Sequence, residues 1–469
     1  MSAIQPISNV IPMNETKKLL RLMTCGSVDD GKSTLIGRLL YDTQSLFDDQ
    51  LALLEDESKR IGNAGDALDF SLLVDGLQSE REQGITIDVA YRYFSTDQTK
   101  FIIADSPGHE QYTRNMVTAA SHSSVALILI DARKGVITQT KRHAYLCSLM
   151  GIETVIVAVN KIDLVDYQES VYESIKQDFL QMSHTLAFRH IDFVPVSALR
   201  GDNIASRSEQ MPWYQGEFLL RLLDNMNICD ATPASESFRF PVQYVNRPDQ
   251  AFRGFSGTVV SGTIRQGDEI LVLPSQKRAN VIEIVTFDGN LSRAVEGEAI
   301  TLVLDREIDI SRGDVVIHAH QDMALGQLVK AELVWLNETA LQLDRQYDFL
   351  FSHRAIQGRI ASVDAHIDIH ELGAKVSKDG IALNDIAEVS IQLQEAVPLD
   401  TFEQHSSTGS FIMIDRISHD TVAGGMIRSI DNVDHRETNE TLSEFELELN
   451  QLIRKHFPHW QALDVRKQS

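Results

Sequence analysis

The chain has 469 residues, which is long enough for several hydrophobic cores and predicts two to four domains. Its formal net charge of −24 disfavours a protein that wraps duplex nucleic acid, because phosphate contacts need clustered lysine and arginine. No apolar run approaches the roughly 20 residues that span a bilayer, and residues 1–18 lack the apolar core of a signal peptide.

The cysteines indicate a reducing compartment. There are three, Cys25, Cys147 and Cys229, and they are too few and too isolated in the sequence for a disulfide framework or a metal cluster. We therefore expect a cytoplasmic protein that does not attach to membranes.

A phosphate-binding loop is predicted near the N-terminus. Residues 26–33 read Gly-Ser-Val-Asp-Asp-Gly-Lys-Ser, which is the pattern of two glycines separated by four residues and followed by Lys and Ser. An apolar stretch at 19–23 predicts the strand that enters this loop, and residues 34–40 predict the helix behind it. In such a loop backbone N–H groups point at a bound anion, although the pattern alone also fits a chance glycine-rich turn.

Two side chains of this loop carry expected chemistry. Lys32 reaches the β- and γ-phosphates of a nucleotide as a point charge. The Ser33 hydroxyl binds Mg²⁺, which neutralises the charge that develops during phosphoryl transfer.

The stretch Glu82-Gln83-Gly84-Ile85-Thr86-Ile87 resembles the switch I signature of the translation-factor class of GTPases. The resemblance implies that Thr86 binds Mg²⁺ only in the GTP-bound state. A segment held by one Mg²⁺ ligand is released on hydrolysis, so the γ-phosphate controls whether the segment is ordered.

A short apolar run at 100–104 predicts a buried strand, and Asp105-Ser106-Pro107-Gly108-His109 follows it. A carboxylate at the end of such a strand holds Mg²⁺ through water, which is the role expected of Asp105. Gly108 offers a flexible amide for the γ-phosphate.

His109 is the candidate residue for orienting the attacking water. The resemblance to the translation-factor class implies this role, and it also implies that Val28 and Ile85 flank the histidine and gate its approach. The alternatives are a solvated loop histidine and two packing residues, because His is common in loops.

The apolar run at 154–159 ends on Asn160-Lys161-Ile162-Asp163. A carboxylate only accepts hydrogen bonds, so Asp163 pairs with N1–H and the exocyclic amine of guanine, whereas adenine has no N1–H. We expect Asn160 and Lys161 to brace the loop and cover the face of the base. This asymmetry predicts GTP rather than ATP as the ligand.

A fourth motif, Ser197-Ala198-Leu199, follows the run at 193–196 and is expected to meet the guanine oxygen through a backbone amide. Four motifs in this order, each at the end of an apolar strand, predict a GTP-binding domain. The residues expected to contact GTP are Gly26, Ser27, Val28, Asp29, Asp30, Gly31, Lys32, Ser33, Thr34, Asp105, Ser106, Pro107, Gly108, His109, Asn160, Lys161, Asp163, Ser197, Ala198 and Leu199. Lys32, Thr86 and His109 are the catalytic candidates, and Ser33, Thr86 and Asp105 (through water) are the Mg²⁺ candidates.

The predicted fold is an α/β P-loop GTPase domain, with a mostly parallel sheet covered by helices on both faces, followed by two antiparallel β-barrels. Alternating strands and helices stop near residue 232, and short strands with frequent glycine turns follow. The predicted division is 1–232 for the GTPase domain, 233–324 and 325–432 for barrels that resemble the second and third domains of elongation factors, and 433–469 for the tail.

Two later segments carry weaker signals. Residues 363–370 alternate apolar and polar, which would put Asp364, His366, Asp368 and His370 on one strand face. A metal site there is less favoured than a solvated face, because consecutive side chains of one strand do not converge on an ion. From Thr441 onward a Thr-x-x-Glu start and apolar residues at helical spacing predict one amphipathic helix that docks on the barrels.

Three details distinguish this chain from protein-synthesis factors. It has Asp29-Asp30 where elongation factors carry Asp-His, it has Ser106 where they carry cysteine, and its tail contains Arg454-Lys455-His456-Phe457-Pro458-His459-Trp460. With these motifs the whole chain resembles the large GTPase subunits of bacterial sulfate adenylyltransferase.

This resemblance implies a smaller catalytic partner subunit. The partner makes adenylyl sulfate and pyrophosphate from ATP and sulfate, the first step of sulfate assimilation, and the large subunit couples this unfavourable step to GTP hydrolysis. The chain has one complete nucleotide-binding set, so ATP is expected to bind elsewhere. Some members carry a fused adenylyl-sulfate kinase, and we expect none here because the sequence ends at Ser469.

Two other functions fit the same motifs. A translation factor would deliver aminoacyl-tRNA to the ribosome, and a stand-alone regulatory GTPase would bind effectors through its switches. Stimulation by ribosomes, by a sulfate-activating subunit or by neither distinguishes the three functions.

Overall fold

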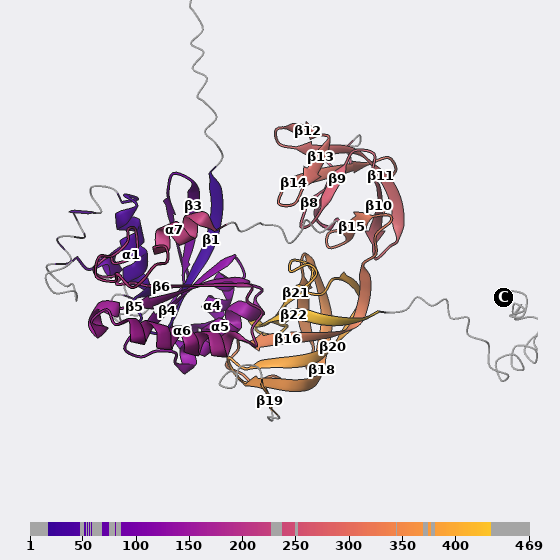
Figure 1. Ribbon diagram of the computed structural model, residues 1–469. Helices are drawn as coiled ribbons and strands as arrows, with labels where there is room; N and C mark the ends of the chain where they lie inside the picture. Colours follow the sequence, from indigo (N-terminus) through magenta and orange to yellow (C-terminus); the bar gives the residue numbers. More distant parts are fainter. Residues whose placement is uncertain are drawn as a thin grey trace, which may run out of the picture.

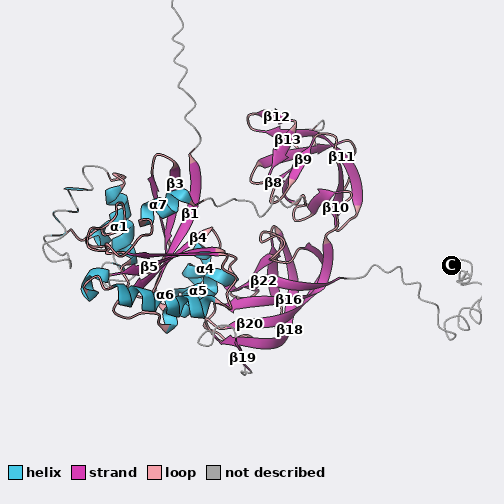
Figure 2. Ribbon diagram, in the orientation of Figure 1, coloured by secondary structure: helices cyan, strands magenta, loops and turns pink. Residues whose placement is uncertain are grey.

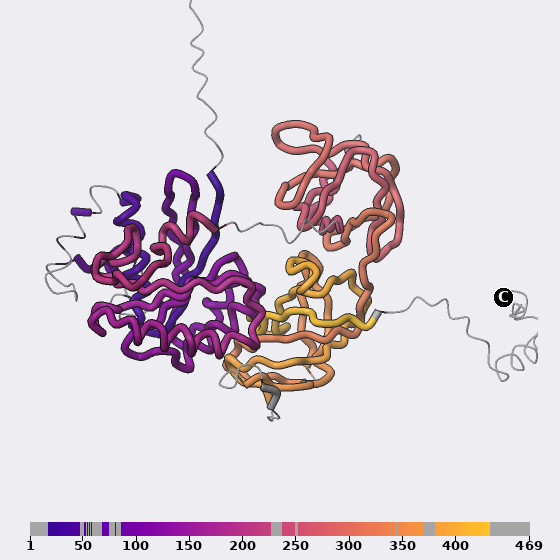
Figure 3. Tube along the Cα trace, viewed as in Figure 1, coloured from indigo at the N-terminus to yellow at the C-terminus, as the bar shows by residue number. Residues whose placement is uncertain are grey.

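The computed structural model describes residues 17–46, 51, 52, 54, 56, 58, 68–74, 80, 86–226, 237–248, 252–343, 345–368, 374–376 and 380–432. Within these residues an α/β unit is followed by two all-β units (Figure 1). The chain trace passes from the indigo and magenta α/β unit through the first β unit to the orange and yellow second one (Figure 3). No helix among the described residues is long and apolar enough to cross a membrane.

The α/β unit is built on a six-stranded sheet with the order β2-β3-β1-β4-β5-β6. All neighbours are parallel except β2, which pairs antiparallel with β3. The central strand β4 is buried along its whole length, as expected for a parallel strand covered on both faces. The strands are β1 Lys18–Cys25, β2 Ala90–Ser95, β3 Thr99–Asp105, β4 Val125–Asp131, β5 Thr154–Asn160 and β6 His190–Pro195.

Helices cover both faces of this sheet (Figure 2). Helices α1 and α7 lie on one side, and α4, α5 and α6 lie on the other. The α-helices are α1 Lys32–Asp42, α4 Thr113–Ala120, α5 Thr138–Leu149, α6 Glu169–Ser183 and α7 Leu219–Asn225. The 3₁₀ helices are η1 Phe70–Leu73, η2 Glu110–Tyr112 and η3 Ile162–Val165.

The first β unit is a closed antiparallel barrel. Its strands run in the order β10-β15-β7-β8-β14-β11-β12, and a further pairing of β10 with β11 closes the sheet, while β9 and β13 form a separate ribbon. Closure removes the exposed strand edges that invite aggregation. The strands are β7 Phe240–Asn246, β8 Gly254–Thr258, β9 Thr263–Arg265, β10 Glu269–Leu273, β11 Lys277–Thr286, β12 Gly289–Leu291, β13 Arg293–Val295, β14 Ala299–Leu304 and β15 Val315–His318.

The second β unit is a barrel of the same kind. Its strand order is β17-β21-β22-β16-β20-β18-β19, and β17 pairs with β18 to close it. The predicted fold class, a P-loop α/β domain followed by two antiparallel barrels, is confirmed. The strands are β16 Ala324–Trp335, β17 Tyr347–Phe351, β18 Arg354–Asp368, β19 Ala374–Val376, β20 Ile386–Leu399, β21 Ser410–Asp415 and β22 Thr421–Asn432.

The predicted common face of Asp364, His366, Asp368 and His370 is wrong for His366. The pairing of β18 with β20 shifts register between Val363 and Ala365, so the strict alternation is interrupted at Asp364. Asp364 is exposed and accepts hydrogen bonds from two serines, whereas His366 is only 4% exposed. His370 and the predicted C-terminal helix lie outside the described residues, and no acidic, histidine or cysteine cluster suited to a metal occurs within them.

The second barrel packs directly on the α/β unit. Leu336, Ile367 and Met426 of the barrel belong to the same buried apolar cluster as the α/β core. Hydrogen bonds also connect the units: Arg114 of α4 donates to the carbonyl of Leu336 (2.5 Å), for example, and Asn384 donates to the carbonyl of Glu110 (3.0 Å). Because Glu110 directly follows His109, the barrel contacts the segment that carries the catalytic candidate.

A buried ion pair joins the two barrels. The guanidinium of Arg239 donates to both carboxylate oxygens of Asp400, at 2.9 and 3.0 Å, and both side chains are 5% exposed. The Thr408 hydroxyl donates to the same carboxylate, and Arg239 also donates to the carbonyl of Asp322. Every charge of this pair is therefore satisfied inside the interface.

Removing one partner of this pair strongly destabilises the protein. We expect Asp400→Ala to lower the free energy of unfolding by about 3–5 kcal/mol, because Arg239 would remain buried without its counter-charge. The double variant Arg239→Met/Asp400→Leu recovers most of that loss, since no charge stays buried. Urea unfolding measures the stability of both variants. Lys176→Ala, which removes the half-exposed ion pair with Glu173 on α6, is the control. An Asp400→Ala variant as stable as the native chain would contradict the expectation.

Candidate functional site

The phosphate loop lies between β1 and α1, and its glycines are required by geometry. Gly31 precedes α1 with φ of 92°, where an L side chain is strained, and an added Cβ would collide with the Asn160 side chain. Gly26 has φ of 150°, and an added Cβ would lie 2.8 Å from the Leu129 carbonyl oxygen. The helix that starts at Lys32 therefore directs its free N–H groups toward this loop.

Lys32 is buried under the phosphate loop. Its ammonium donates to the carbonyl oxygens of Gly26 and Ser27, each at 3.0 Å. Burial lowers the pKa of Lys32, and the nearby carboxylates of Asp105 and Asp30 oppose this effect. The structure thus holds a cation at the position where the sequence motif places the β- and γ-phosphates.

Asp105 ends β3 beside the end of β1. The Thr24 hydroxyl donates to its carboxylate (3.2 Å), and the Ser106 hydroxyl donates to the Thr24 carbonyl (2.6 Å). Parallel pairing of β1 with β3 places Thr24 opposite Asp105 in register. The motif reasoning did not include Thr24, which holds both the Asp105 carboxylate and the Ser106 hydroxyl in place.

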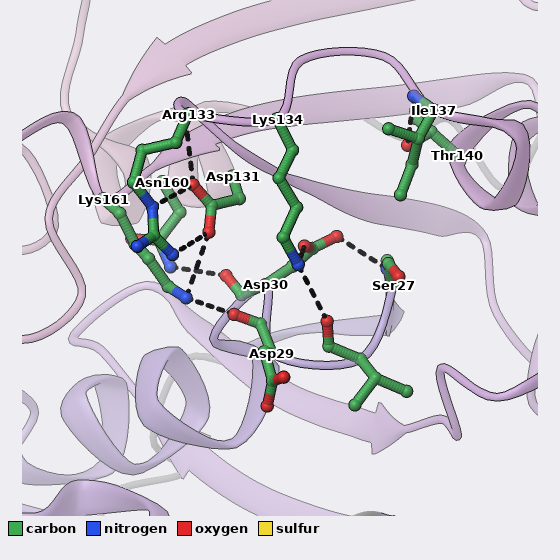
Figure 4. Close-up of polar contacts among 12 residues, drawn as sticks. Ser27, Asp29, Asp30, Asp131, Arg133, Lys134, Ile137, Thr140, Asn160 and Lys161 are labelled. Atoms are coloured by element: carbon green, nitrogen blue, oxygen red, sulfur yellow. Dashed lines mark hydrogen bonds and ion pairs between the residues drawn. The ribbon is translucent and has the colours of Figure 1, made fainter. Parts of the chain in front are cut away.

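The phosphate loop also contacts the segment after β4. The Asp30 carboxylate accepts a hydrogen bond from the Ser27 amide (2.6 Å) and lies 3.9 Å from the ammonium of Lys134 (Figure 4). Lys134 also reaches the Val28 carbonyl at 3.5 Å. Burial raises the pKa of Asp30, an effect that Lys32 opposes. The Asp30 side chain thus stabilises the phosphate loop by accepting the hydrogen bond from the Ser27 amide.

Gly108 packs against the phosphate loop, and His109 lies at its exposed edge. A Cβ on Gly108 would lie 2.6 Å from the Lys32 ammonium and 2.7 Å from the Gly26 carbonyl oxygen, so only glycine fits. His109 is exposed and precedes η2, where its Nδ1 accepts a hydrogen bond from the Gln111 amide (3.3 Å). The catalytic candidate is thus accessible and next to the loop that holds Lys32.

Asn160 connects the phosphate loop to the fourth motif. Its amide nitrogen donates to the Asp30 carbonyl (2.7 Å), and its amide oxygen accepts from the Ala198 amide (2.9 Å). The expected bracing role of Asn160 therefore has a direct geometric basis. The Ala198 amide thus donates to Asn160, and Leu199, the last residue of the motif, is exposed.

Lys161 and Asp131 form an ion pair above the loop. The Lys161 ammonium lies 3.2 Å from an Asp131 oxygen and donates to the Asp29 carbonyl (Figure 4). Arg133 donates to both Asp131 oxygens. Burial raises the pKa of Asp131, but the hydrogen bonds from Arg133 and the charge of Lys161 outweigh it and lower the pKa to about 2. Asp131 thus stays ionised and holds Lys161 over the loop.

Asp163 sits at the start of η3 and faces a cation. Its carboxylate lies 3.4 Å from Nε of Arg200, which is exposed. The Ser197 hydroxyl oxygen accepts a hydrogen bond from the Arg200 amide (3.2 Å). The third and fourth motifs are therefore adjacent in space, as neighbouring strands β5 and β6 require.

Comparisons with known families agree with this architecture. The family model of the elongation factor Tu GTP binding domain matches residues 17–236, that of elongation factor Tu domain 2 matches 255–317, and that of GTP-eEF1A C-terminal domain-like proteins matches 328–428. The first covers the strands that carry all four motifs. The α/β unit is therefore a translation-factor-type GTPase domain.

Curated relatives match almost the whole chain. A protein of Alteromonas mediterranea is 51% identical over 99% of this chain and 98% of its own length, and one of Saccharophagus degradans is 51% identical over 98% and 97%. One of Aliivibrio fischeri strain MJ11 is 52% identical over 97% and 95%. All three are named sulfate adenylyltransferase subunit 1. The chain belongs to the sulfate adenylyltransferase subunit 1 family.

Solved structures also match this chain. The Saccharomyces cerevisiae Ski7 GTPase-like domain bound to GTP is 18% identical, with a TM-score of 0.48 over 88% of this chain and 97% of that one. Sup35 complexed with GDP is 21% identical, with a TM-score of 0.40 over 90% and 97%. The family assignment rests on the sequence relatives.

The switch I candidate Thr86 is half-buried just ahead of β2 in this subunit 1 chain, and Ile85 lies outside the described residues. The amide of Ile87 donates to the Glu80 carboxylate (3.0 Å), and the Ile87 carbonyl accepts from the Asn115 side chain (2.7 Å). These contacts hold the segment after Thr86 against α4. Ser33 and Thr34 lie half-buried in the first turn of α1, and Pro107 is buried.

The motif reasoning also missed several residues outside the four motifs that contact the site. Besides Thr24, these are Lys134, which reaches the phosphate loop, Asp131, which pairs with Lys161, and Arg200, which pairs with Asp163. Asp131 could have been found from its place at the end of the buried strand β4, the one central strand end without an assigned motif. Cys25 and Cys147, expected to be isolated, are free thiols whose sulfurs lie 3.9 Å apart beneath the loop.

His143 makes the stability of the subunit sensitive to acid. Burial, with the charge of Lys32, lowers the pKa of His143 to about 3, against 6.5 for an exposed histidine. As pH falls below 6.5, the unfolded chain therefore binds the proton before the folded chain does. The free energy of unfolding falls progressively between pH 6.5 and 3 because of this group, and it is unaffected by the group above pH 6.5. Between pH 7.5 and 5.5 we expect the native chain to lose about 1.4 kcal/mol more than His143→Asn.

Urea unfolding at the two pH values measures this difference. His122→Asn is the matched control, because His122 is exposed in the turn after α4 and its side chain contacts the nearby Ser121 hydroxyl and Thr118 carbonyl. Equal losses in the native chain and in His143→Asn would show that His143 is not held neutral.

Proposed function

We propose that this chain is the GTPase subunit of a heteromeric sulfate adenylyltransferase. In this role it hydrolyses GTP and so drives a smaller catalytic subunit, which forms adenylyl sulfate and pyrophosphate from ATP and sulfate. The observation that carries the proposal is about 51% identity over 99% of the chain to a protein named sulfate adenylyltransferase subunit 1, together with a GTPase domain in the same residues. The assembly we propose is a heterodimer, or an oligomer of heterodimers.

The proposed Mg²⁺ site consists of oxygen donors. Ser33 lies in the first turn of α1, and Asp105 is a buried carboxylate held by the Thr24 hydroxyl. Hydroxyl, water-mediated carboxylate and phosphate oxygens suit Mg²⁺, a hard cation that retains several waters. Thr86 is the proposed third protein ligand. When bound, Mg²⁺ supplies positive charge to the phosphate oxygens, and Ser33, Asp105 and Thr86 hold it.

The proposed hydrolysis depends on three residues of the chain. Lys32 places its cation on the β- and γ-phosphates once it leaves the carbonyls of Gly26 and Ser27. Gly108, packed on that loop, donates its amide to the γ-phosphate. His109 orients the water that attacks the γ-phosphorus, in line with the leaving oxygen, from its exposed position beside Gly108.

The proposed guanine selection uses Asp163 and the loops that Asn160 ties together. Asp163 accepts from N1–H and the exocyclic amine of guanine, and the Arg200 guanidinium, 3.4 Å from its carboxylate, helps to orient it. Lys161, held by Asp131, covers the base, and a backbone amide of Ser197-Ala198 meets the guanine oxygen. Adenine would leave the Asp163 carboxylate without a donor.

We also propose the domain division 1–232, 233–324, 325–432 and 433–469, supported by the change of sheet after β6 and again after β15. A reducing cytosol is the proposed compartment, because Cys25 and Cys147 lie 3.9 Å apart as free thiols.

The experiment that tests this function is a comparison of activators. GTP hydrolysis by the purified chain is followed alone, with a recombinant small adenylyltransferase subunit plus ATP and sulfate, and with ribosomes plus aminoacyl-tRNA. The proposed function predicts stimulation only by the small subunit and its substrates, with pyrophosphate released in parallel. Stimulation by ribosomes alone would replace the proposal with a translation role.

A further inference from the structure

One polar side chain of α5 contacts the phosphate loop but has no part in the proposed chemistry. His143 is 2% exposed, and its Nδ1 lies 3.1 Å from the amide nitrogen of Gly26, which can only donate. A hydrogen bond between these two atoms therefore requires Nδ1 to be the acceptor, at the first residue of the phosphate loop. Burial lowers the pKa of His143 to about 3, so the ring is neutral at physiological pH.

Gln139 extends this contact to the second motif. It lies one turn before His143 on α5, and its side-chain amide nitrogen is 3.0 Å from Nε2 of His143 and 3.1 Å from the carbonyl oxygen of Gly108. Gly108 in turn lies against Gly26 so closely that no Cβ fits between them. The four groups of Gly26, His143, Gln139 and Gly108 therefore form one closed ring of contacts.

The protons available cannot satisfy all three hydrogen bonds of this ring at once. A neutral imidazole carries one N–H, so it accepts at only one nitrogen. If Nδ1 accepts from Gly26, Nε2 carries the proton and must donate it to an acceptor. The Gln139 side-chain amide must then rotate so that its oxygen faces Nε2, and Gln139 no longer donates to the Gly108 carbonyl. If Gln139 donates to Gly108 and to Nε2, the bond to Gly26 is lost. The ring thus has two exclusive arrangements, which differ in whether Gly108 is held.

We propose that Gln139 and His143 are positioning residues for GTP hydrolysis, which hold the Gly108 carbonyl and thereby place His109 relative to the phosphate loop. The carbonyl that Gln139 holds belongs to the peptide that joins Gly108 to His109. The orientation of this peptide plane therefore determines the position of the His109 backbone nitrogen and Cα. This inference rests on the proposed role of His109.

The test is a cycle of variants in the full chain together with its small subunit. Gln139→Leu keeps the size of the side chain and removes the donor to Gly108. We expect kcat for GTP hydrolysis to fall by about 10- to 10²-fold, the cost of misplacing a catalytic group, while the affinity for GTP changes less than about twofold. Thr138→Ala, at the exposed neighbour of Gln139, is the matched control and keeps native kcat.

The double variant His109→Ala/Gln139→Leu separates positioning from a structural defect. If Gln139 acts through His109, the double variant hydrolyses GTP no more slowly than His109→Ala, because the group to be positioned is gone. A general loosening of the loop would multiply the two losses and weaken GTP binding. Multiplied losses, or a native kcat in Gln139→Leu, would overturn the inference. A native kcat in His109→Ala would instead overturn the proposed role of His109.

Discussion

Replacing His109 by alanine lowers the rate of GTP hydrolysis by about 10²- to 10⁴-fold, the range attributed to a side chain that handles the attacking water. GTP still binds, because Lys32, Asn160 and the glycines of the phosphate loop keep their contacts. The expected signature is a fall in kcat with little change in the affinity for GTP. Single-turnover hydrolysis and equilibrium binding of a fluorescent GTP analogue measure the two quantities separately.

Two further variants serve as controls for this result. Lys32→Ala should weaken GTP binding itself, since it removes the buried cation of the loop. His122→Ala, at an exposed histidine in the turn after α4, should behave as the native chain does. Near-native hydrolysis by His109→Ala, with GTP binding intact, would remove His109 from the mechanism and leave the exposed loop histidine as a solvated residue.

Asp163→Asn changes which base the site accepts. Guanine presents two donors to the Asp163 carboxylate, and an amide offers one acceptor and one donor, so one contact becomes a repulsion. One charge-assisted hydrogen bond, worth about 1.5–3 kcal/mol, is lost, which predicts a fall in GTP affinity of at least about 10- to 10²-fold. Xanthosine triphosphate has a carbonyl in place of the exocyclic amine, so its affinity should rise in the same variant.

Competition between the two nucleotides measures this exchange of specificity. Asp166→Asn is the control, because Asp166 lies exposed three residues later and its left-handed backbone accepts Asn. If Asp163→Asn bound GTP as tightly as the native chain and still rejected xanthosine triphosphate, Asp163 would not read the base.

The parts of the site that the sequence predicts are those set by local geometry. The phosphate loop needs Gly31 before Lys32 because of its positive φ, and this requirement is visible as a spacing of residues. Asp105 and Asn160 each end a buried strand, and parallel strands bring such ends to one edge of the sheet. The GTPase fold and the gathering of the motifs follow from these rules.

The supporting residues depend on packing between distant segments, which leaves no local pattern. Thr24 becomes important only through its pairing with β3, and Arg200 only through the approach of η3. Gln139 and His143 lie on a helix whose spacing looks like that of any buried face. Their role follows from the position of α5 beneath the phosphate loop, which no residue pattern specifies.

The alternating segment at 363–370 shows a different limit of sequence-based prediction. Alternation predicts one face for Asp364 and His366 only while the register is regular, and the irregularity between Val363 and Ala365 breaks that condition. A bulge has no reliable sequence signature when no glycine marks it. The burial of His366 against this expectation therefore came from backbone geometry.

Coupling of GTP hydrolysis to sulfate activation is the property that distinguishes this function from that of a free GTPase. The direct measurement is the amount of adenylyl sulfate formed from ATP and sulfate by this chain with the small catalytic subunit, with GTP or with a non-hydrolysable GTP analogue. Coupling predicts that hydrolysable GTP raises the final yield of adenylyl sulfate above the yield with the analogue, and that His109→Ala abolishes the difference. Equal yields with GTP and with the analogue, from a small subunit shown to be active, would contradict the coupling.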